Sequence, residues 1–377
     1  MKTMFYCQHS IGMGHLMRTL RLAEECFKDG PVRLICGGPI PVKLKIDPRM
    51  EVDALPPLII GPRKALIDPF HLTDVDRIFE RRLDQSAQAV REFSPDALVV
   101  EMFPFGRKKF AKEILSIIEA SRESSNARLF SSVRDVLITS RRDQSRHDCR
   151  AATILNEHFD GVLVHSDPTL VSLDATFSAL SRVRIPIHYT GYVSSNCAST
   201  ACRRERTVIV SAGGGRVGRT LIEAAIDAAK NIKKSLGLDM VVVTGPLSNA
   251  RTTYATGKGP AKRVEFIKDM TAVLERSTLS ISQCGYNTAA DVLKARIPAV
   301  FVPFETKTED EQLHRADLLA GCGRTVTLRQ YALTPETLIQ AARQALGTAK
   351  KPQTAPPVSL DGARRSREIV SEWIGHA

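Results

Sequence analysis

Short apolar runs alternate with longer stretches of helical spacing along most of the chain. In the first half the runs fall at 3–8, 32–37, 52–57, 97–100, 129–133, 162–165 and 187–191. In the second half they fall at 207–211, 240–243, 279–282, 299–303 and 325–328. Such runs, separated by helical stretches, are typical of buried parallel strands covered by helices. The pattern therefore predicts an α/β protein with two doubly wound sheets.

The helical stretches and the polar segments between them suggest where the chain divides. Apolar residues recur every three or four positions over 15–27, 220–236, 335–346 and 361–374. Residues 193–206 are polar and contain little apolar surface, which favours a linker. We therefore expect an N-terminal domain at 1–192, a linker at 193–206, a second domain at 207–355 and a terminal helical segment at 356–377.

The composition excludes several classes of protein. A chain of 377 residues is long enough for two domains, and no run approaches the ~20 apolar residues of a membrane span. Eight cysteines without a Cys-x-x-Cys pair indicate reduced thiols, and no signal-peptide core is present, so we expect a cytoplasmic protein. The charge of +12 fits an anionic substrate, an acidic membrane surface on the inner face, or simply a basic exterior. No nucleic-acid module accompanies it, so we predict no nucleic-acid partner.

Residues 282–312 form the most informative stretch. An apolar strand ending at Ser282 is followed by Gly285, where we expect a turn with positive φ, and then by a helix capped by Asn287 or Thr288. A strand, a glycine turn and a helix N-terminus together form an anion site, because backbone N–H groups and the helix dipole point at one spot. Asp291, one turn into the helix, could accept hydrogen bonds from ribose hydroxyls.

A second candidate site follows the first strand. Gly12 and Gly14 lie in a loop, and His15 begins the next helix with Arg18 one turn further on the same face. The helix dipole disfavours an imidazolium there, and a neutral imidazole can take a proton from a hydroxyl. A helix-capping histidine without chemistry is the alternative.

The 283–312 stretch resembles the donor-binding signature of GT-B glycosyltransferases that use nucleotide sugars, particularly UDP-glycosyltransferases and the bacterial enzymes that form lipid II. Its matching positions are Gln283, Gly285, Tyr286, Asn287, Thr288, Asp291, Glu311 and Gln312. The resemblance implies that Thr288 binds phosphate, Asp291 the ribose, and Glu311–Gln312 the donor sugar. It also implies two Rossmann-like domains facing across a cleft, and a last helix that returns to the first domain.

Two more segments resemble the lipid II-forming family. Gly213, Gly214, Gly215 and Arg216 follow a strand as that family's diphosphate loop does; a dinucleotide site is disfavoured because the next strand lacks a terminal acid. Phe266 and Ile267 resemble the segment that reads the base. The loop with Gly14, His15 and Arg18 resembles both this family and the UDP-sugar hydrolase of the pseudaminic acid pathway, which implies a catalytic histidine.

Three further polar residues end strands of the first half: Glu101, Arg134 and Asp135. If the sheet is parallel they lie near His15, so we predict that Glu101 orients the base and that Arg134 and Asp135 contact the acceptor. An Arg134–Asp135 salt bridge is the structural alternative. The basic residues at 107–109 and 141–142 could meet an anionic, lipid-linked acceptor or form a solvated face.

Together these features predict a glycosyltransferase that moves a sugar from a nucleotide-diphosphate sugar, expected to be a UDP-sugar, to a hydroxyl acceptor with inversion. We expect no metal and no cofactor, because helix N-termini and glycine loops would stabilise the leaving diphosphate. The alternatives are a nucleotide-sugar hydrolase, an epimerase of the same fold and a non-catalytic nucleotide binder. Asp74 and Asp76 mimic a metal motif, but they are better explained as acids at a helix start.

Overall fold

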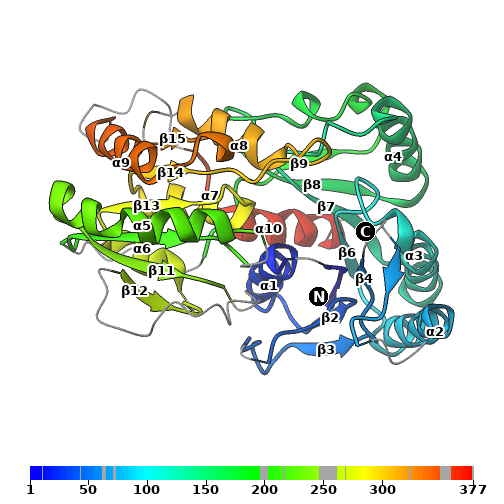
Figure 1. Cartoon of the computed structure of the whole chain (residues 1–377). Helices are drawn as coiled ribbons and strands as arrows, with labels where there is room; N and C mark the ends of the chain where they lie inside the picture. Colours follow the sequence, from blue (N-terminus) through cyan, green and yellow to red (C-terminus); the bar gives the residue numbers. More distant parts are fainter. Residues whose placement is uncertain are drawn as a thin grey trace.

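The computed structural model contains two parallel sheets, each covered by helices (Figure 1). It describes residues 1–10, 12–42, 44–61, 65–70, 74–195, 203–214, 217–245, 261–267, 269–321, 323, 325–348 and 358–375. Gly215 and Arg216 lie outside the described residues, as do residues 196–202 of the predicted linker and the Pro-rich segment before the last helix.

The first sheet has the strand order β3-β2-β1-β6-β7-β8-β9, and each neighbouring pair is parallel. Its strands are β1 (Thr3–Cys7), β2 (Val32–Cys36), β3 (Glu51–Ala54), β6 (Ala97–Glu101), β7 (Arg128–Arg134), β8 (Gly161–His165) and β9 (Ile187–Tyr189). A two-stranded antiparallel ribbon, β4 (Ile59–Ile60) with β5 (Leu66–Ile67), stands apart from it.

The second sheet has the order β12-β11-β10-β13-β14-β15 and is also parallel. Its strands are β10 (Thr207–Ser211), β11 (Asp239–Val243), β12 (Ala261–Val264), β13 (Leu279–Ser282), β14 (Ala299–Phe301) and β15 (Thr325–Thr327). In both sheets the order reverses beside the first strand of the series, which is the doubly wound arrangement. The predicted α/β architecture is therefore confirmed.

Helices connect the strands and cover both faces of the sheets. They are α1 (Gly14–Cys26), α2 (Val75–Phe93), α3 (Ala111–Ser125), α4 (Gln144–His158), α5 (Arg219–Leu236), α6 (Met270–Arg276), α7 (Tyr286–Ala295), α8 (Glu311–Gly321), α9 (Pro335–Thr348) and α10 (Gly362–Gly375). Short 3-10 turns occupy Lys108–Phe110, Leu173–Ala175, Leu180–Arg182 and Gln330–Ala332.

The strand β1 shows why its sequence reads as an uninterrupted apolar run. Met4 and Tyr6 point into the core under α2, α3 and α4, whereas Phe5 and Cys7 point into the core under α1 and α10. Successive side chains of a strand lie on opposite faces, and here helices cover both faces, so every position of β1 is buried. The same burial of all positions recurs in β6 and β8.

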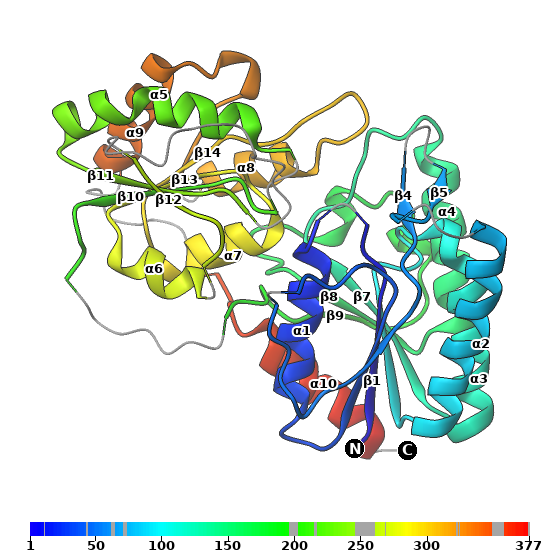
Figure 2. The ribbon, with the colours of Figure 1, turned by 60° about the horizontal axis from the view of Figure 1, so that its bottom comes forward.

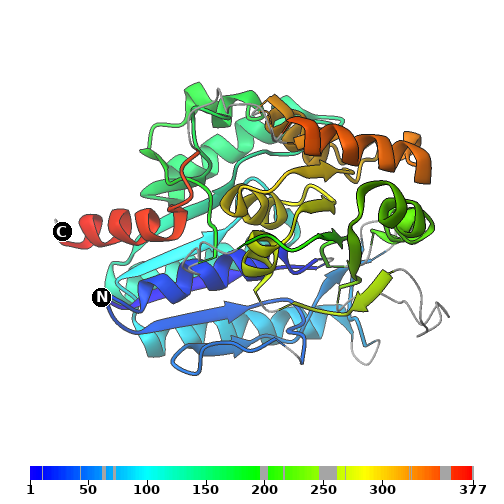
Figure 3. The same cartoon turned by 90° about the vertical axis from the view of Figure 1, so that its left-hand side faces the viewer.

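The last helix, α10, lies against α1 on the first domain (Figure 3). Trp373 meets the ring of Phe130 edge-on at 5.9 Å, and the Arg367 guanidinium donates to Asp29 at 2.9 Å. The C-terminal segment therefore crosses back from the second sheet and completes the apolar layer over the first.

The two sheets bring their helix starts together at the domain boundary, where α1 and α7 face each other (Figure 2). The Asn287 side-chain amide donates to the Gly14 carbonyl at 3.0 Å, so the first turns of these helices are in direct contact. Two of our local expectations for this region are wrong. Gly285 has φ −66° and serves itself as the N-cap, while Asn287 and Thr288 lie within the first turn of α7. An extended cap residue is enough to start this helix, so no left-handed turn is required.

Candidate active site

Each sheet reverses its strand order at one point, and in open α/β sheets such switch points lie at the ligand-binding edge. In the first sheet the reversal lies between β1 and β6, and in the second between β10 and β13. His15 follows β1 on α1, and Glu101 is the last residue of β6. The loop at Gly213 follows β10, and the segment from Gln283 to Thr288 follows β13. The chain thus places its candidate groups at both switch points.

The first-domain group is centred on the buried carboxylate of Glu101. The His15 Nδ1 atom lies 2.6 Å from Glu101 Oε1, Arg107 donates to Oε2 at 3.1 Å, and Arg18 also donates to Oε1. An ionised carboxylate can only accept hydrogen bonds, so Nδ1 carries the imidazole proton. Nε2 of His15 is left as the basic nitrogen.

The pKa shifts in this group have identifiable causes. Burial lowers the pKa of His15 to about 3, and the positive charge of Arg107 adds to this against the opposing charge of Glu101. Burial alone would raise the pKa of Glu101, but the charges of Arg107 and Arg18 and the hydrogen bond from His15 outweigh it and hold that pKa below its ordinary value. The imidazole is therefore neutral at pH 7, as a general base must be.

The loop after β6 is bent to bring Arg107 onto Glu101. Met102 has φ 59° and Arg107 has φ 64°, two left-handed conformations in residues other than glycine. Such conformations cost energy and are commonly retained where they position functional groups. The loop leaves the sheet at Met102 and turns back, so that the Arg107 guanidinium reaches Glu101 at the end of the same strand.

The second-domain group consists of small residues and backbone. A Cβ added at Gly213 or at Gly285 would meet no atom within 4 Å, so both glycines border open space at the sheet edge. Gly214 is half-buried beside Gly213, and Gln283 is buried with its amide donating to the Val217 carbonyl at 3.1 Å. Gln283 therefore ties the end of β13 to the loop before α5.

Some of the buried polar atoms without a partner in the protein lie at or near the two switch points. Within the described residues they include Nε of Arg18, Arg107 and Arg134, Oγ of Ser282 and Oδ1 of Asn287. Buried polar groups in native proteins almost always have a hydrogen-bond partner, so these atoms are available to bond to a ligand at this edge.

Thr288 is half-buried in the first turn of α7, beside the open space at Gly285. Phe266 and Ile267 follow β12, and β11 separates that strand from β10. Both are half-buried, and Ile267 packs against the apolar cluster that contains Leu274 and Val292. Their roles with phosphate and base stay predictions.

Asp291 is 5% exposed and has a first-domain partner that the sequence did not indicate. Its Oδ1 atom accepts from Thr271 at 3.0 Å and from the Arg21 guanidinium at 3.0 Å. Burial raises the pKa of Asp291, although Arg21 opposes the shift. A ribose would have to share this carboxylate with Arg21, so the ribose role stays a prediction.

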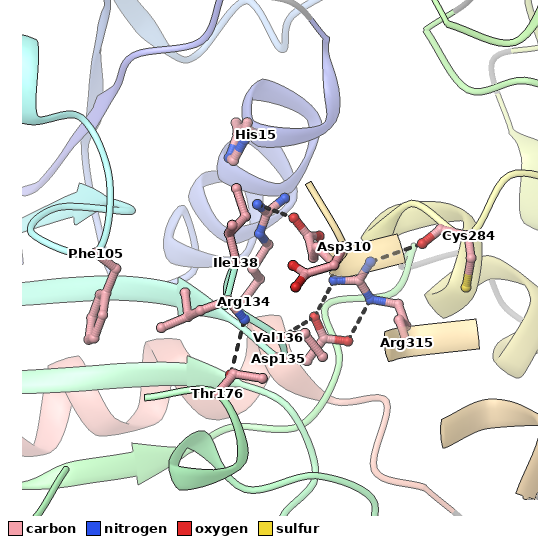
Figure 4. Close-up of polar contacts among 12 residues, drawn as sticks. His15, Phe105, Arg134, Asp135, Val136, Ile138, Thr176, Cys284, Asp310 and Arg315 are labelled. Atoms are coloured by element: carbon pink, nitrogen blue, oxygen red, sulfur yellow. Dashed lines mark hydrogen bonds and ion pairs between the residues drawn. The ribbon is translucent and has the colours of Figure 1, made fainter. Parts of the chain in front are cut away.

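The acceptor-side prediction for Asp135 is corrected by the structure. Asp135 is fully buried and forms a two-point ion pair with Arg315 of α8 at 2.6 and 2.7 Å, while the Tyr192 hydroxyl donates to it at 2.9 Å (Figure 4). The alternative Arg134–Asp135 bridge is also absent, because Arg134 pairs with Glu311 instead. Asp135 is therefore part of the domain interface and is closed to an acceptor.

Glu311 and Gln312 likewise have partners in the protein. Glu311 begins α8 and accepts from Arg134 of the first domain and from Arg315 at 2.7 Å. Gln312 accepts from the Phe304 backbone N–H at 3.1 Å and so orients the loop after β14. Arg134 lies between His15 and the Asp135–Arg315 pair (Figure 4). Arg315 lies four residues after Glu311 on one helix face, a spacing that could have drawn attention to it.

Arg18 and Tyr286 are also buried in the domain interface. Arg18 is 1% exposed and stacks over the Tyr286 ring at 5.0 Å, so it supports Glu101, and a donor-binding role for Arg18 stays a prediction. Tyr286, at the signature's aromatic position, donates from its hydroxyl to the His165 carbonyl at 2.9 Å and accepts from the Val193 N–H at 2.9 Å. Burial raises the pKa of Tyr286, which keeps the phenol neutral.

Metal-binding groupings and membrane spans were also sought in the described part of the chain. Within it, no three His, Cys, Asp or Glu side chains are grouped so that they could hold a metal ion. None of its helices is both long and apolar enough to span a bilayer.

Solved structures with the same fold are glycosyltransferases. The calicheamicin glycosyltransferase CalG4 aligns with a TM-score of 0.63 at 14% identity, over 100% of this chain and 98% of its own. MurG of Acinetobacter baumannii aligns with a TM-score of 0.58 at 16% identity, over 98% and 99% respectively. At these identities the likeness establishes the fold, and the predicted GT-B arrangement of two Rossmann-like domains is confirmed.

The sequence comparisons identify the second half of the chain more closely. Residues 208–368 match the glycosyltransferase family 28 C-terminal domain. A UDP-N-acetylglucosamine--N-acetylmuramyl-(pentapeptide) pyrophosphoryl-undecaprenol N-acetylglucosamine transferase from Glaesserella parasuis serovar 5 is 31% identical over 144 residues, which are 38% of this chain and 40% of that protein. The match thus spans about 40% of the length of the curated relatives. The predicted resemblance to this group of transferases is confirmed.

Proposed function

We propose that the protein transfers a sugar from a nucleotide-diphosphate sugar to a hydroxyl acceptor. The observation that carries the proposal is the meeting of the two switch points. Asn287 at the start of α7 bonds to Gly14 at the start of α1, so the neutral His15 stands beside a helix N-terminus suited to a diphosphate. A base beside an anion cradle is what sugar transfer from such a donor needs.

In the proposed reaction, His15 Nε2 takes the proton of the acceptor hydroxyl while that oxygen bonds to the anomeric carbon of the donor. The bond from that carbon to the diphosphate breaks, and the electron pair leaves with the nucleotide diphosphate. Attack from the face opposite the leaving group inverts the anomeric configuration. The charge on the diphosphate is balanced by N–H groups at the start of α7 and by the loop at Gly213, with Thr288 adding a hydroxyl.

Glu101 has a positioning role in this scheme. It accepts the Nδ1 proton of His15, fixes the tautomer and stabilises the imidazolium that forms during transfer. Charge neutralisation by backbone and hydroxyl groups needs no metal, so we propose a metal-independent reaction without a cofactor.

The names of the relatives indicate which donor and acceptor to test. The curated relatives use UDP-N-acetylglucosamine and a pyrophosphoryl-undecaprenol acceptor, as their names state. We propose a UDP-sugar as donor, beginning with UDP-N-acetylglucosamine, and a lipid-linked hydroxyl acceptor. Such an acceptor would place the protein in the cytoplasm, in peripheral contact with the inner membrane face, which suits a chain with a formal charge of +12.

The test measures nucleotide release from a set of nucleotide sugars with and without an extract of bacterial glycolipids. We expect slow release from the donor alone, marked acceleration by the extract, and a product heavier by one sugar residue. Release at about 1 per second or more without any acceptor, and no glycosylated product, would instead establish a nucleotide-sugar hydrolase. If a nucleotide sugar stabilises the protein but is not turned over under any condition, the protein is a nucleotide-sugar-binding protein and not an enzyme.

A further inference from the structure

A hollow of about 390 Å³ opens on the first domain between α3, α4 and the loop that follows β6. Its apolar part is formed by Phe103, Pro104 and Ile154, with alanines of both helices beside them. Its charged rim carries Lys108, Arg146 and Arg150. The hollow contains neither His15 nor any residue of the second domain, so it is separate from the active site described above.

The three cations of the rim are free to bind an anion. Lys108, Arg146 and Arg150 are exposed, and none of them forms an ion pair with a described residue. The lining contains a single carboxylate, the exposed Asp143, so positive charge exceeds negative. Asp148 lies behind the lining and is occupied by Gln144 and Ser178.

The helix geometry adds to this positive field. α3 follows β6 and α4 follows β7, so both helices begin at the carboxyl edge of the sheet, on the same side of it (Figure 1). Each has 15 residues, and the positive end of its dipole lies at that edge. Positions 146, 150 and 154 of α4, together with the cap residue Asp143, follow one another at helical spacing, so one stripe of the helix faces the hollow.

We propose that this hollow binds the acceptor, and that the acceptor carries a phosphate group joined to an apolar portion. The phosphate would lie against Lys108, Arg146 and Arg150, and the apolar portion against Phe103, Pro104 and Ile154. That the bound molecule is the acceptor rests on the proposed function, whereas the phosphate and apolar groups it should carry follow from the residues of the hollow alone. The loop after β6 connects the two sites, because it begins at Glu101 beside His15 and passes Phe103 and Pro104.

Direct binding to the full chain tests the site without any turnover. The probes are octyl phosphate below its aggregation concentration, inorganic phosphate and octanol, each titrated by calorimetry. We expect octyl phosphate to bind more tightly than either fragment, with an affinity that falls as salt rises. The variant Lys108→Gln/Arg146→Gln/Arg150→Gln should lose about tenfold in that affinity, the combined effect of three exposed charge pairs.

A matched control removes the same charge elsewhere. Lys230→Gln/Lys234→Gln/Arg343→Gln changes three exposed cations of α5 and α9 and should bind octyl phosphate as the wild type does. Equal affinities in the two triple variants would overturn the proposal. Binding only to phosphatidylglycerol vesicles, and not to monomeric octyl phosphate, would also overturn it in favour of a membrane surface.

The same variants separate this inference from the proposed function. Stabilisation by UDP-N-acetylglucosamine should be unchanged in the site variant, because the donor cradle is in the other domain. If octyl phosphate binds as expected while no nucleotide sugar is turned over, the hollow is a phosphate-binding site and the transferase assignment fails. If turnover occurs and the site variant keeps the wild-type acceptor KM, the hollow is not the acceptor site.

Discussion

The two domains have the same strand order around their switch points, yet they place opposite chemistry there. At the first switch point His15, Arg18 and Arg107 all bond to Glu101, and these four ionisable side chains are largely withdrawn from water. At the second, the edge is formed by glycines, short polar side chains and the start of a helix. Topology fixes where a ligand can bind, and the local residues decide what the protein can do there.

The difference follows from what each end has to supply in the proposed reaction. A base has to be neutral and correctly oriented, which calls for a buried imidazole and a fixed carboxylate partner. A diphosphate needs several donors at close range, and backbone N–H groups can approach only where side chains are small. The protein therefore uses burial in one domain and openness in the other.

The largest expected effect comes from removing the base. In His15→Ala, turnover should fall about 10²–10⁴-fold, as is typical when a general base is lost. Donor affinity should change little, because the donor cradle belongs to the second domain. The measurements are single-turnover product formation and donor-induced stabilisation. His158→Gln at the C-terminal end of α4 is the control, and near-normal turnover in His15→Ala would exclude the assignment.

The second effect concerns the interface that holds the two switch points together. Asp135→Asn weakens a fully buried ion pair with Arg315 and should destabilise the protein by about 3–5 kcal/mol, because the buried guanidinium loses one of its two carboxylate partners and keeps only Glu311. Denaturant unfolding measures this. If Asp135 were an acceptor contact instead, stability would be preserved and the acceptor KM would rise, which would break our correction.

The sequence predicted the elements better than it predicted these interface pairs. Strands buried on both faces, such as β6 and β8, leave uninterrupted apolar runs, so they were found to within a residue or two. The β4–β5 ribbon and α4 were not predicted: the ribbon has two-residue strands, and α4 is largely polar on its outer side. The positions of His15 and Thr288 in the first turn of a helix could be inferred, because in each case a strand and a glycine precede the helix in the sequence.

The cross-domain pairs could not be predicted for a physical reason. Asp135 and Arg315 are 180 positions apart, and Arg21 and Asp291 are 270 apart. Which cation meets which carboxylate depends on how the domains dock, and no local spacing encodes that. The sequence therefore indicated Asp135 and Asp291 as chemically interesting, but not that arginines of the opposite domain already hold them.

A third prediction uses substitutions of two glycines to test whether the open space at the second switch point holds the diphosphate. Gly285→Ala should fold with little loss of stability, since its φ is −66° and an added Cβ would meet nothing within 4 Å. That Cβ would project into the space proposed for the diphosphate, so donor affinity should fall about tenfold, or roughly 1.4 kcal/mol. Donor titrations by calorimetry measure this.

Gly218→Ala is the matched contrast. Its Cβ would lie 1.9 Å from the Ala212 Cβ, so the loop before α5 would have to shift, at a cost of about 1–3 kcal/mol in stability. Unchanged donor affinity in Gly285→Ala would mean that the open space is not the diphosphate site.

The smallest expected effect is a shift in the pH dependence of the rate, which tests the His15–Glu101 pair at the first switch point. The rate requires neutral His15, so kcat/KM falls as pH falls through the pKa of this imidazole in the free enzyme. Because that pKa is lowered, the acidic limb should lie well below the ordinary value of 6.5. Arg107 helps to lower it, so Arg107→Gln should move the limb to higher pH by several tenths of a unit to about one unit. Lys109→Gln removes the same charge from an exposed neighbour and should move it less. A limb near 6.5 in the wild type, or equal shifts in the two variants, would show that the rate is governed by a group other than the His15–Glu101 pair.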